Sequence, residues 1–282
     1  MGIRKRILAA LLIPLAALAA LVLCFASEEL EVTFYQLPSA KLPPGETIRL
    51  AVLADLHNRE YGEKNADLIE EIRSQKPDLI LMAGDMVNYF ETRTDIVVDL
   101  CKALQEIAPV FYGLGNHEGT LIYASGIPLH EELREAGICV LINDSQRITV
   151  RDTEFYIGGT AVSEENYEKH GKTFLDRFWE KETDAFKLLI SHFPSLYYEI
   201  LADIPMDLGI CGHYHGGQIQ IPGLGGLYSV KHGLFPQYCQ GIYQLENASI
   251  FVSRGMGSGH KIPRINNRPE LAFIDIISEN NP

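Results

Sequence analysis

Apolar runs that end in a polar residue recur along the chain, and they restrict its fold more than any other feature of the sequence. Three of these runs occupy residues 49–55, 78–85 and 110–117. The segments between them, residues 63–75 and 93–107, have apolar residues at helical spacing. Strands that alternate with helices predict an α/β core in which right-handed crossovers join neighbouring strands.

The second half of the chain has a different pattern. Residues 146–159 and 241–255 each favour a β-hairpin, and residues 184–192 and 207–213 are typical of buried strands that end in histidine. Residues 271–276 predict a final strand. We therefore expect two sheets packed face to face, with helices on the outside.

The charge of the chain restricts its partners. A chain of 282 residues with a net charge of −13 and a pI near 5.1 is not expected to bind nucleic acid, which selects basic surfaces. The same charge disfavours electrostatic adsorption to anionic lipid. The five cysteines have no paired short spacing, which predicts buried thiols rather than a disulfide framework or a zinc site.

An apolar segment near the N-terminus predicts a membrane anchor. Residues 7–26 have no charged side chain, and as a helix they would span about 30 Å, the thickness of a bilayer core. Arg4, Lys5 and Arg6 precede this segment and predict a cytoplasmic N-terminus with the rest of the chain exported. The alternative is a cleaved signal peptide.

These features divide the chain into three expected parts. They are an anchor or uncleaved signal over residues 1–26, a linker or leading edge strand over residues 27–46, and one large domain over residues 47–282. The expected location is the cell membrane, with a single span and the large domain on the extracytoplasmic side.

Polar residues gather at the ends of the predicted strands, the edge at which α/β sheets bind ligands. They are Asp55, Asp85, Asn116, His192, His213 and His215, with His57 two residues after Asp55 and His117 next to Asn116. Taken singly, each has a simpler explanation. An Asp after a strand often caps the following helix, and an isolated His-x-His is more often a pair of surface histidines in a turn. Helix capping does not explain the histidines.

This combination of side chains is typical of a two-metal site. Hard carboxylates with neutral imidazoles suit divalent Mn, Fe or Zn. One carboxylate can bridge two ions, and the pair can clamp the attacking and leaving oxygens of a displacement at phosphorus. Water held between the ions loses a proton near neutral pH and becomes the nucleophile.

The motifs DLH, GDMVN, GNHE, SH and GHYH occur in an order and spacing that resemble the calcineurin-like metallophosphoesterases, over about residues 48–276. The sequence that begins at GHYHGGQ looks more narrowly similar to the membrane-anchored bacterial branch, which includes enzymes resembling the UDP-2,3-diacylglucosamine diphosphatases of lipid A synthesis. The resemblance implies a four-layer α-β-β-α sandwich of two mixed sheets.

The resemblance also implies roles for the strand-end residues. The first ion would be held by Asp55, His57 and His215, the second by Asn116, His192 and His213, with Asp85 as the bridge. His117 would not be a ligand. It would contact the phosphoryl oxygen or protonate the leaving group. Neighbours on an extended segment point in opposite directions, so His117 and Asn116 would face different partners.

Other polar residues have open interpretations. His130 and His170 are expected in solvated segments, whereas His232 and His260 lie in glycine-rich loops and could line the mouth of the site. Three arginines fit either a guanidinium fork on a phosphate or surface salt bridges. They are Arg254, Arg264 and Arg268.

The resemblance implies a hydrolase of phosphoester or pyrophosphate bonds with two divalent metal ions, for which we expect Mn, with Fe and Zn as alternatives. The attacking group would be a hydroxide that bridges the ions. The anchor suggests a lipid-linked or cell-envelope substrate, such as a UDP-diacylglucosamine-like molecule. A phosphodiesterase or phosphatase acting on small soluble substrates, and a non-catalytic scaffold of the same fold, are the alternatives.

Overall fold

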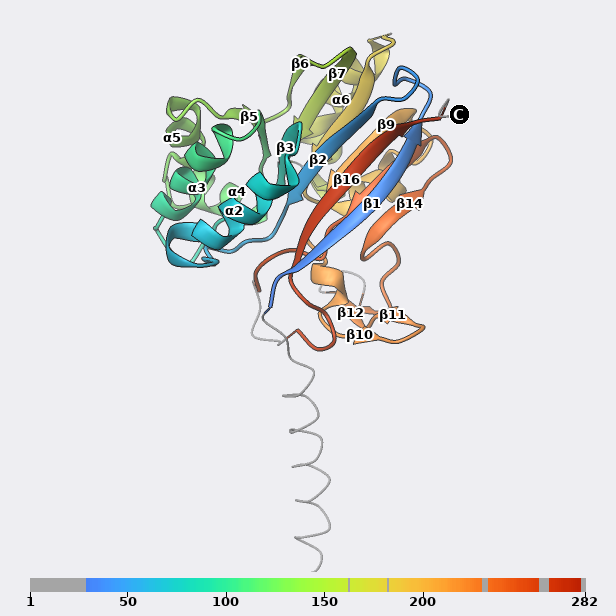
Figure 1. Ribbon diagram of the computed structural model, residues 1–282. Coiled ribbons are helices and arrows are strands. Elements are labelled where there is room, and N and C mark those ends of the chain that lie inside the picture. Colours follow the sequence, from blue (N-terminus) through green and yellow to red (C-terminus); the bar gives the residue numbers. More distant parts are fainter. Residues whose placement is uncertain (1–28, 162, 182, 230–232, 259–263, 280–282) are drawn as a thin grey trace, which may run out of the picture.

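Two six-stranded β-sheets packed face to face form the centre of the protein (Figure 1). The computed structural model describes residues 29–161, 163–181, 183–229, 233–258 and 264–279. The first sheet has the order β1-β16-β2-β3-β4-β5. Its strands are β1 (Glu31–Ser39), β2 (Thr47–Leu53), β3 (Leu79–Ala83), β4 (Val110–Gly113), β5 (Cys139–Leu141) and β16 (Glu270–Ser278).

The second sheet has the order β14-β15-β9-β8-β7-β6. Its strands are β6 (Asp144–Val150), β7 (Thr153–Thr160), β8 (Phe186–Ser191), β9 (Met206–Cys211), β14 (Gly241–Gln244) and β15 (Ala248–Val252). Each sheet contains both parallel and antiparallel pairs, so both are mixed, as predicted.

Helices cover the outer faces of the sheets, and two small hairpins project from one end (Figure 1). The helices are α2 (Ala66–Gln75), α3 (Asp95–Gln105), α4 (Asn116–Tyr123), α5 (Leu129–Glu135) and α6 (Lys172–Glu180). Single helical turns are η1 (Glu63–Asn65), η2 (Glu164–Asn166), η3 (Tyr167–Gly171), η4 (Leu196–Ile200) and η5 (His215–Gly217). The hairpins pair β10 (Gln220–Ile221) with β11 (Gly225–Gly226), and β12 (Tyr228–Ser229) with β13 (Gly233–Leu234).

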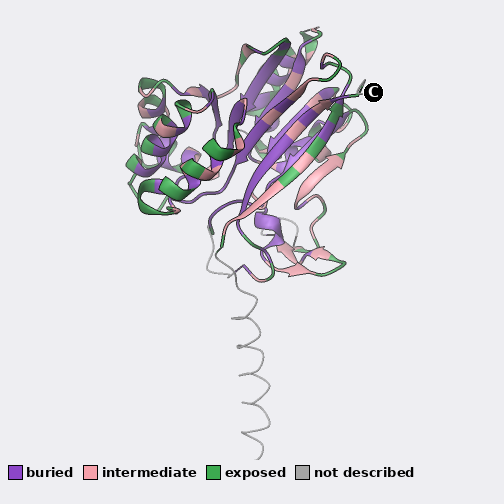
Figure 2. Ribbon diagram, in the orientation of Figure 1, coloured by how far each residue is buried: buried purple, intermediate pink, exposed green. Residues whose placement is uncertain are grey.

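Alternating side chains divide the core into layers. Along β2, Leu50 and Val52 lie between the two sheets, whereas Ala51 and Leu53 pack in the cluster beneath the helices. Leu188 of β8 meets the first pair from the opposite sheet. Figure 2 shows the central strands of both sheets buried, the edge strands β1 and β14 less buried, and the outer helix faces exposed. The predicted two-sheet α/β sandwich is confirmed.

The N-terminal predictions fall partly outside the described residues. Residues 7–26, predicted as a membrane span, lie there; among the residues described, no helix is long and apolar enough to cross a bilayer. Of the two expectations for residues 27–46, a linker or a leading edge strand, the strand is confirmed, because β1 lies within them and pairs with β16 along nine residue pairs. This long-range pairing makes residues 31–39 the edge of the first sheet rather than a linker.

Strand direction brings functional segments to one edge. The strands β2, β3, β4 and β5 are parallel, so their carboxyl ends share one edge of the first sheet. Because β16 is antiparallel to β2 and β1 is parallel to β16, β1 begins at that same edge. The chain therefore enters the described domain beside the carboxyl ends of the central strands (Figure 1).

Candidate metal centre

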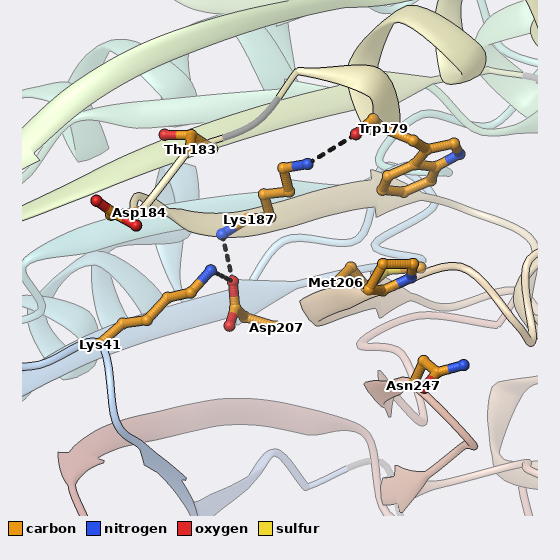
Figure 3. Close-up of a pocket in the computed structure, with 9 residues that line it drawn as sticks. Lys41, Trp179, Thr183, Asp184, Lys187, Met206, Asp207 and Asn247 are labelled. Carbon is orange, nitrogen blue, oxygen red and sulfur yellow. Dashed lines mark hydrogen bonds and ion pairs between the residues drawn. The ribbon is translucent and has the colours of Figure 1, made fainter.

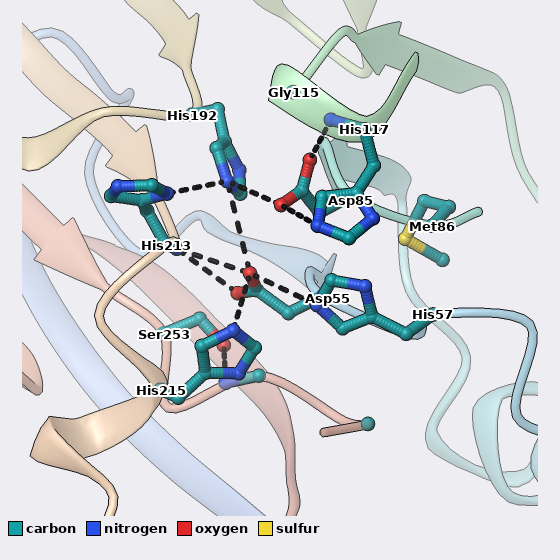
Figure 4. A network of polar contacts seen from close by, with 12 residues as sticks. Asp55, His57, Asp85, Met86, Gly115, His117, His192, His213, His215 and Ser253 are labelled. Atoms are coloured by element: carbon teal, nitrogen blue, oxygen red, sulfur yellow. Dashed lines mark hydrogen bonds and ion pairs between the residues drawn. The ribbon is translucent and has the colours of Figure 1, made fainter. Parts of the chain in front are cut away.

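Loops from both sheets meet at the carboxyl edge and bring the predicted residues together (Figure 4). The first sheet supplies Asp55 and His57 after β2, Asp85 after β3, and Asn116 and His117 after β4. The second sheet supplies His192 after β8, and His213 and His215 after β9. No single segment could form this site, because loops of both sheets contribute to it.

The side chains form two groups that could each hold an ion. The potential ligand atoms of Asp55, His57 and His215 all lie within 4.8 Å of one another, and so do those of Asp85, His192 and His213. The first group is the set that the family resemblance implies for one ion, and the second joins the proposed bridge Asp85 to two of the three ligands implied for the other ion. A third group of the same kind joins His57 and Asp85 to His117. The assignment of ligands stays a prediction, and His117 lies within reach of the centre.

His192 connects the two groups. Its Nε2 lies 3.1 Å from Oδ2 of Asp85 and 3.8 Å from Oδ1 of Asp55. Its Nδ1 lies 2.7 Å from the carbonyl oxygen of Ala83, which can only accept a hydrogen bond. Nδ1 therefore carries a proton, which fixes the ring and directs Nε2 toward the carboxylates, as expected of a metal ligand.

Buried oxygen atoms complete the fit to divalent ions. Both carboxylates are buried, and Oδ1 of Asn116 is also buried without a hydrogen-bond partner among the described residues. A buried amide oxygen is costly unless it has a partner. Carboxylate, amide and imidazole groups together suit Mn, Fe or Zn. The residues present therefore fit a centre of two divalent ions.

Electrostatics favour added positive charge. Burial raises the pKa of Asp55 to about 7 and outweighs the opposing charge of His192. Burial acts in the same direction on Asp85, but the charge and hydrogen bond of His192 outweigh it and hold the pKa of Asp85 below its usual range. Burial alone would lower the pKa of His192, but Asp85 raises it to about 10. One imidazolium thus lies beside two buried carboxyl groups, and burial disfavours the charge of Asp55, which a bound cation would stabilise.

His117 lies at the start of a helix, not on an extended segment. Asn116 and His117 are the first two residues of α4, so the expected alternation is wrong and the two side chains diverge by about 100° around the helix axis. The His117 backbone N–H donates to Oδ1 of Asp85 at 2.8 Å. Its Nδ1 accepts the N–H of Tyr89 at 3.2 Å, which leaves Nε2 as the protonated nitrogen of a neutral ring. Nε2 lies 3.8 Å from Oδ2 of Asp85.

Several of the candidate metal ligands have a left-handed backbone conformation, which orients their side chains. Positive φ angles of 48° to 72° occur at Asp55, His57, Asp85, His213 and His215. His213 and His215 follow β9 in a turn and do not belong to the strand itself. Asp and His adopt this conformation more readily than most residues, yet each instance costs roughly 1–3 kcal/mol.

Two glycines of the motifs leave room for the carboxylates. A Cβ at Gly115 would lie 2.2 Å from Oδ1 of Asp85, and one at Gly212 would lie 2.4 Å from Oδ2 of Asp55. No side chain fits at such distances. The glycine of GNHE and the first glycine of GHYH are therefore part of the site.

Glu118 has a role that the sequence analysis missed. Its buried carboxylate accepts the backbone N–H groups of Asp85 and Met86, both at 2.8 Å, and that of Gly115 at 2.9 Å. The hydroxyl of Tyr112 donates to it at 2.8 Å. Glu118 occupies the third position of α4, and this position of a capping box was the available signal. It ties the loop after β3 to the loop after β4.

The three arginines differ in their surroundings. Arg254 lies 2.8 Å from Glu31 and 3.3 Å from Glu270, and Arg268 lies 3.5 Å from Glu29, so both form salt bridges. Arg264 fits neither expected role. Only 1% exposed, it donates to the carbonyl oxygens of Gly255 and Gly257 and lies 3.2 Å from Nδ1 of His215.

The remaining histidines and cysteines lie outside the centre. His170 is exposed and His130 is half-buried on α5, whereas His232 and His260 lie outside the described residues. The four cysteines within the described residues are free thiols, as predicted, and three of them are buried.

A separate cavity of about 530 Å³ lies at the opposite edge, near the first residues of β8 and β9 (Figure 3). Lys41 lies 2.7 Å from Asp207, and the ammonium of Lys187 donates to the carbonyl of Trp179 at 3.0 Å. None of the predicted ligands lines this cavity.

Comparisons with known proteins agree with this geometry. The family model described as calcineurin-like phosphoesterase matches residues 48–217. Phosphodiesterase YaeI of Escherichia coli is 30% identical over 232 residues, which cover 81% of this chain and 82% of the relative. The uncharacterized metallophosphoesterase YkuE of Bacillus subtilis is 26% identical over 264 residues, covering 89% and 87%. The crystal structure of phosphopantetheinyl hydrolase from Mycobacterium tuberculosis superposes on this chain with a TM-score of 0.48 and 15% sequence identity. The superposition covers 75% of this chain and 91% of that one.

Proposed function

The chain belongs to the calcineurin-like phosphoesterase family and is a metal-dependent phosphoester hydrolase, and from this premise we propose that it cleaves a phosphodiester or pyrophosphate bond in a lipid-linked substrate of the cell envelope. The name of the Escherichia coli relative, a phosphodiesterase, supports the choice of a diester over a monoester. The candidate ligand groups present in this chain speak against the non-catalytic scaffold of the same fold.

The arrangement of two ligand groups around His192 and Asp85 carries the proposal. We assign Asp55, His57 and His215 to one ion, and Asn116, His192 and His213 to the other, with Asp85 shared. Mn is the expected metal, because carboxylate, amide and imidazole ligands without a thiolate suit it. When bound, two such ions supply the nucleophile and neutralise charge at the phosphorus.

His117 is the proposed proton donor. Its Nδ1 accepts the N–H of Tyr89, so the neutral ring presents a proton on Nε2 toward the centre. The same geometry would let Nε2 donate a hydrogen bond to a phosphoryl oxygen. Transfer of this proton to the leaving oxygen would assist bond cleavage in a way that the ions do not.

Aromatic rings beside His117 support a substrate with an apolar part. The Tyr89 ring lies 4.8 Å from the His117 ring, and the Phe90 ring lies 3.9 Å from Tyr89. Phe90 is 65% exposed, which is unusual for a large apolar side chain next to a polar centre. An acyl chain or a base of the substrate could cover this ring.

The proposed location follows from residues 7–26, which would anchor the chain by a single span with the hydrolase domain on the extracytoplasmic side. The substrate would then lie in or at the membrane. A phosphoester of a small soluble molecule is the alternative, since anchored enzymes also act on soluble substrates.

Metal analysis and a substrate panel test the proposal. Full-length protein stripped of metal and reloaded with Mn should bind two ions per chain. It should hydrolyse bis-nitrophenyl phosphate or a nucleotide-linked glycolipid faster than nitrophenyl phosphate. An Asp55→Asn variant is the matched control for loss of one ligand. A preference for the monoester would overturn the substrate class, and fewer than two ions would overturn the dinuclear centre.

A further inference from the structure

The two small hairpins carry apolar side chains that point into solvent. Together they form what we call the apolar lobe, residues 219–229 and 233–235. Leu224 and Leu234 are both 67% exposed, and Phe235 is 51% exposed. Two leucines and a phenylalanine on one small projection are costly to hydrate. Figures 1 and 2 show that the lobe projects from the end of the molecule and is little buried.

The apolar lobe is fixed to the metal centre. It follows η5, which begins with His215, and a Cβ at Gly217 would lie 2.6 Å from Gly226 of β11. Leu227 links the two hairpins, because its N–H donates to the carbonyl of Ile219 at 2.8 Å and its carbonyl accepts the N–H of Phe235 at 2.8 Å. The lobe therefore has a set position relative to the proposed ligands.

The lobe also lies on the side where the chain enters the domain. Ile219 bridges to Ile265, and three residues later Arg268 pairs with Glu29 at 3.5 Å. Residue 29 is the first described residue, and residues 7–26 without charge precede it closely. Four residues separate position 26 from β1 and can span at most about 18 Å.

The part of the sequence that contains the lobe has very few carboxylates. Between Asp207 and Glu270 the only carboxylate in the sequence is Glu246, although the chain has 37 Asp and Glu residues. Glu246 lies in the β14–β15 turn, at the opposite edge from the lobe. A chain of net charge −13 is repelled by an anionic surface. The lobe side has few carboxylates, and Glu29 and Glu31 at the same edge pair with Arg268 and Arg254, so this side is the one best able to approach such a surface.

We propose that the apolar lobe docks on the lipid bilayer that residues 7–26 enter, and thereby holds the metal centre against the membrane surface. The proposal rests on the membrane location in the proposed function but not on its chemistry. Leu224, Leu234 and Phe235 would lie in the interface as anchors. A substrate embedded in the same leaflet would then reach the centre without leaving the bilayer.

Tryptophan fluorescence tests the contact directly. The chain has a single tryptophan, Trp179, which lines the cavity at the opposite edge. Full-length protein would be reconstituted in phosphatidylethanolamine–phosphatidylglycerol vesicles that contain lipids brominated on their acyl chains. The additional emission of a Leu224→Trp variant should fall at least about twofold, because its side chain reaches the acyl boundary. Wild-type emission from Trp179 should not change.

A second exposed position provides the matched control. Tyr123 is 72% exposed at the end of α4, outside the lobe, and Tyr123→Trp should resist quenching. Unquenched Leu224→Trp, equal quenching of both variants, or failure of the full chain to float with the vesicles would overturn the docking.

Activity separates docking from chemistry. A Leu224→Asp/Leu234→Asp variant should lose about tenfold in turnover of a phosphodiester lipid held in vesicles, because charged tips leave the interface. Its hydrolysis of bis-nitrophenyl phosphate in solution should match wild type. If the wild type hydrolyses no lipid while Leu224→Trp is quenched, the proposed substrate is wrong and the docking stands. Equal lipid turnover by the double variant and wild type would overturn the docking.

Discussion

Glu118→Gln should destabilise the protein strongly, although Glu118 touches neither the predicted ligands' side chains nor solvent. The carboxylate accepts three close backbone N–H groups and the Tyr112 hydroxyl, and it offers no donor of its own. The glutamine amide keeps one acceptor oxygen, but its NH₂ group would face hydrogen-bond donors in place of the second oxygen. With NH₂ in place of Oε2, the N–H groups of Asp85 and Gly115 both lose their acceptor.

The magnitude follows from these bonds. A hydrogen bond to a charged group contributes about 1.5–3 kcal/mol, so two lost bonds cost about 3–6 kcal/mol. For a domain of this size that corresponds to a fall in Tm of roughly 10 °C. The Asp85 backbone would also move, and by analogy with outer-shell partners of other metal ligands the Mn affinity should fall about 10–100-fold.

Urea unfolding and metal titration of the full chain in detergent measure both effects. Glu131→Gln is the control, because Glu131 is exposed on α5 and its substitution removes the same charge. A Glu118→Gln protein as stable as this control would show that the carboxylate does not hold the two loops, and the reasoning from its hydrogen bonds would be refuted.

Four further predictions concern the centre and the anchor. Asp85→Asn should weaken both ions by at least about 100-fold, because removing one partner of a buried ion pair costs about 3–5 kcal/mol; two retained ions would contradict the bridge. His117→Asn should keep both ions but lower turnover about 10²–10⁴-fold, and less for a nitrophenolate leaving group; lost metal would make His117 a ligand. Chelation should remove about 2.7 kcal/mol of stability per ion when free metal had been 100 times Kd, measured as a lower Tm; an unchanged Tm would contradict metal binding. A reporter fused after Pro282 should be active only outside the cytoplasm, and cytoplasmic activity would refute the orientation.

The order of elements could be predicted because it depends on local pattern. The segments around Leu50, Leu81 and Leu188 either alternate between apolar and polar residues or are continuously apolar, and both patterns are typical of strands packed between two layers. The pairing of β1 with β16 could not be read from the sequence, because its partners are about 240 residues apart. Nothing in the polar, proline-containing segment before β2 indicates a partner so distant.

The candidate site was predictable by residue type but not by backbone. Asp55 and His215 were identified because carboxylates and imidazoles end successive strands. Their left-handed φ angles of 51° and 48° depend on the loops that close over them, which no spacing rule encodes. Arg264 was misjudged for a similar reason. An arginine in a glycine-rich loop is usually exposed, and its burial depends on carbonyls at Gly255 and Gly257 that face inward.

The division of the site between two sheets links its chemistry to its stability. Asp55 and Asp85 come from the first sheet, and His192 and His213 from the second, so an ion held by both groups joins the sheets at their common edge. Left-handed backbone at the ligands and the burial of the Asp55 carboxyl group both raise the free energy of the metal-free protein. Binding of divalent ions offsets that cost at the place where it arises. The strain in these loops is therefore better understood as preorganisation for metal than as a defect of the fold.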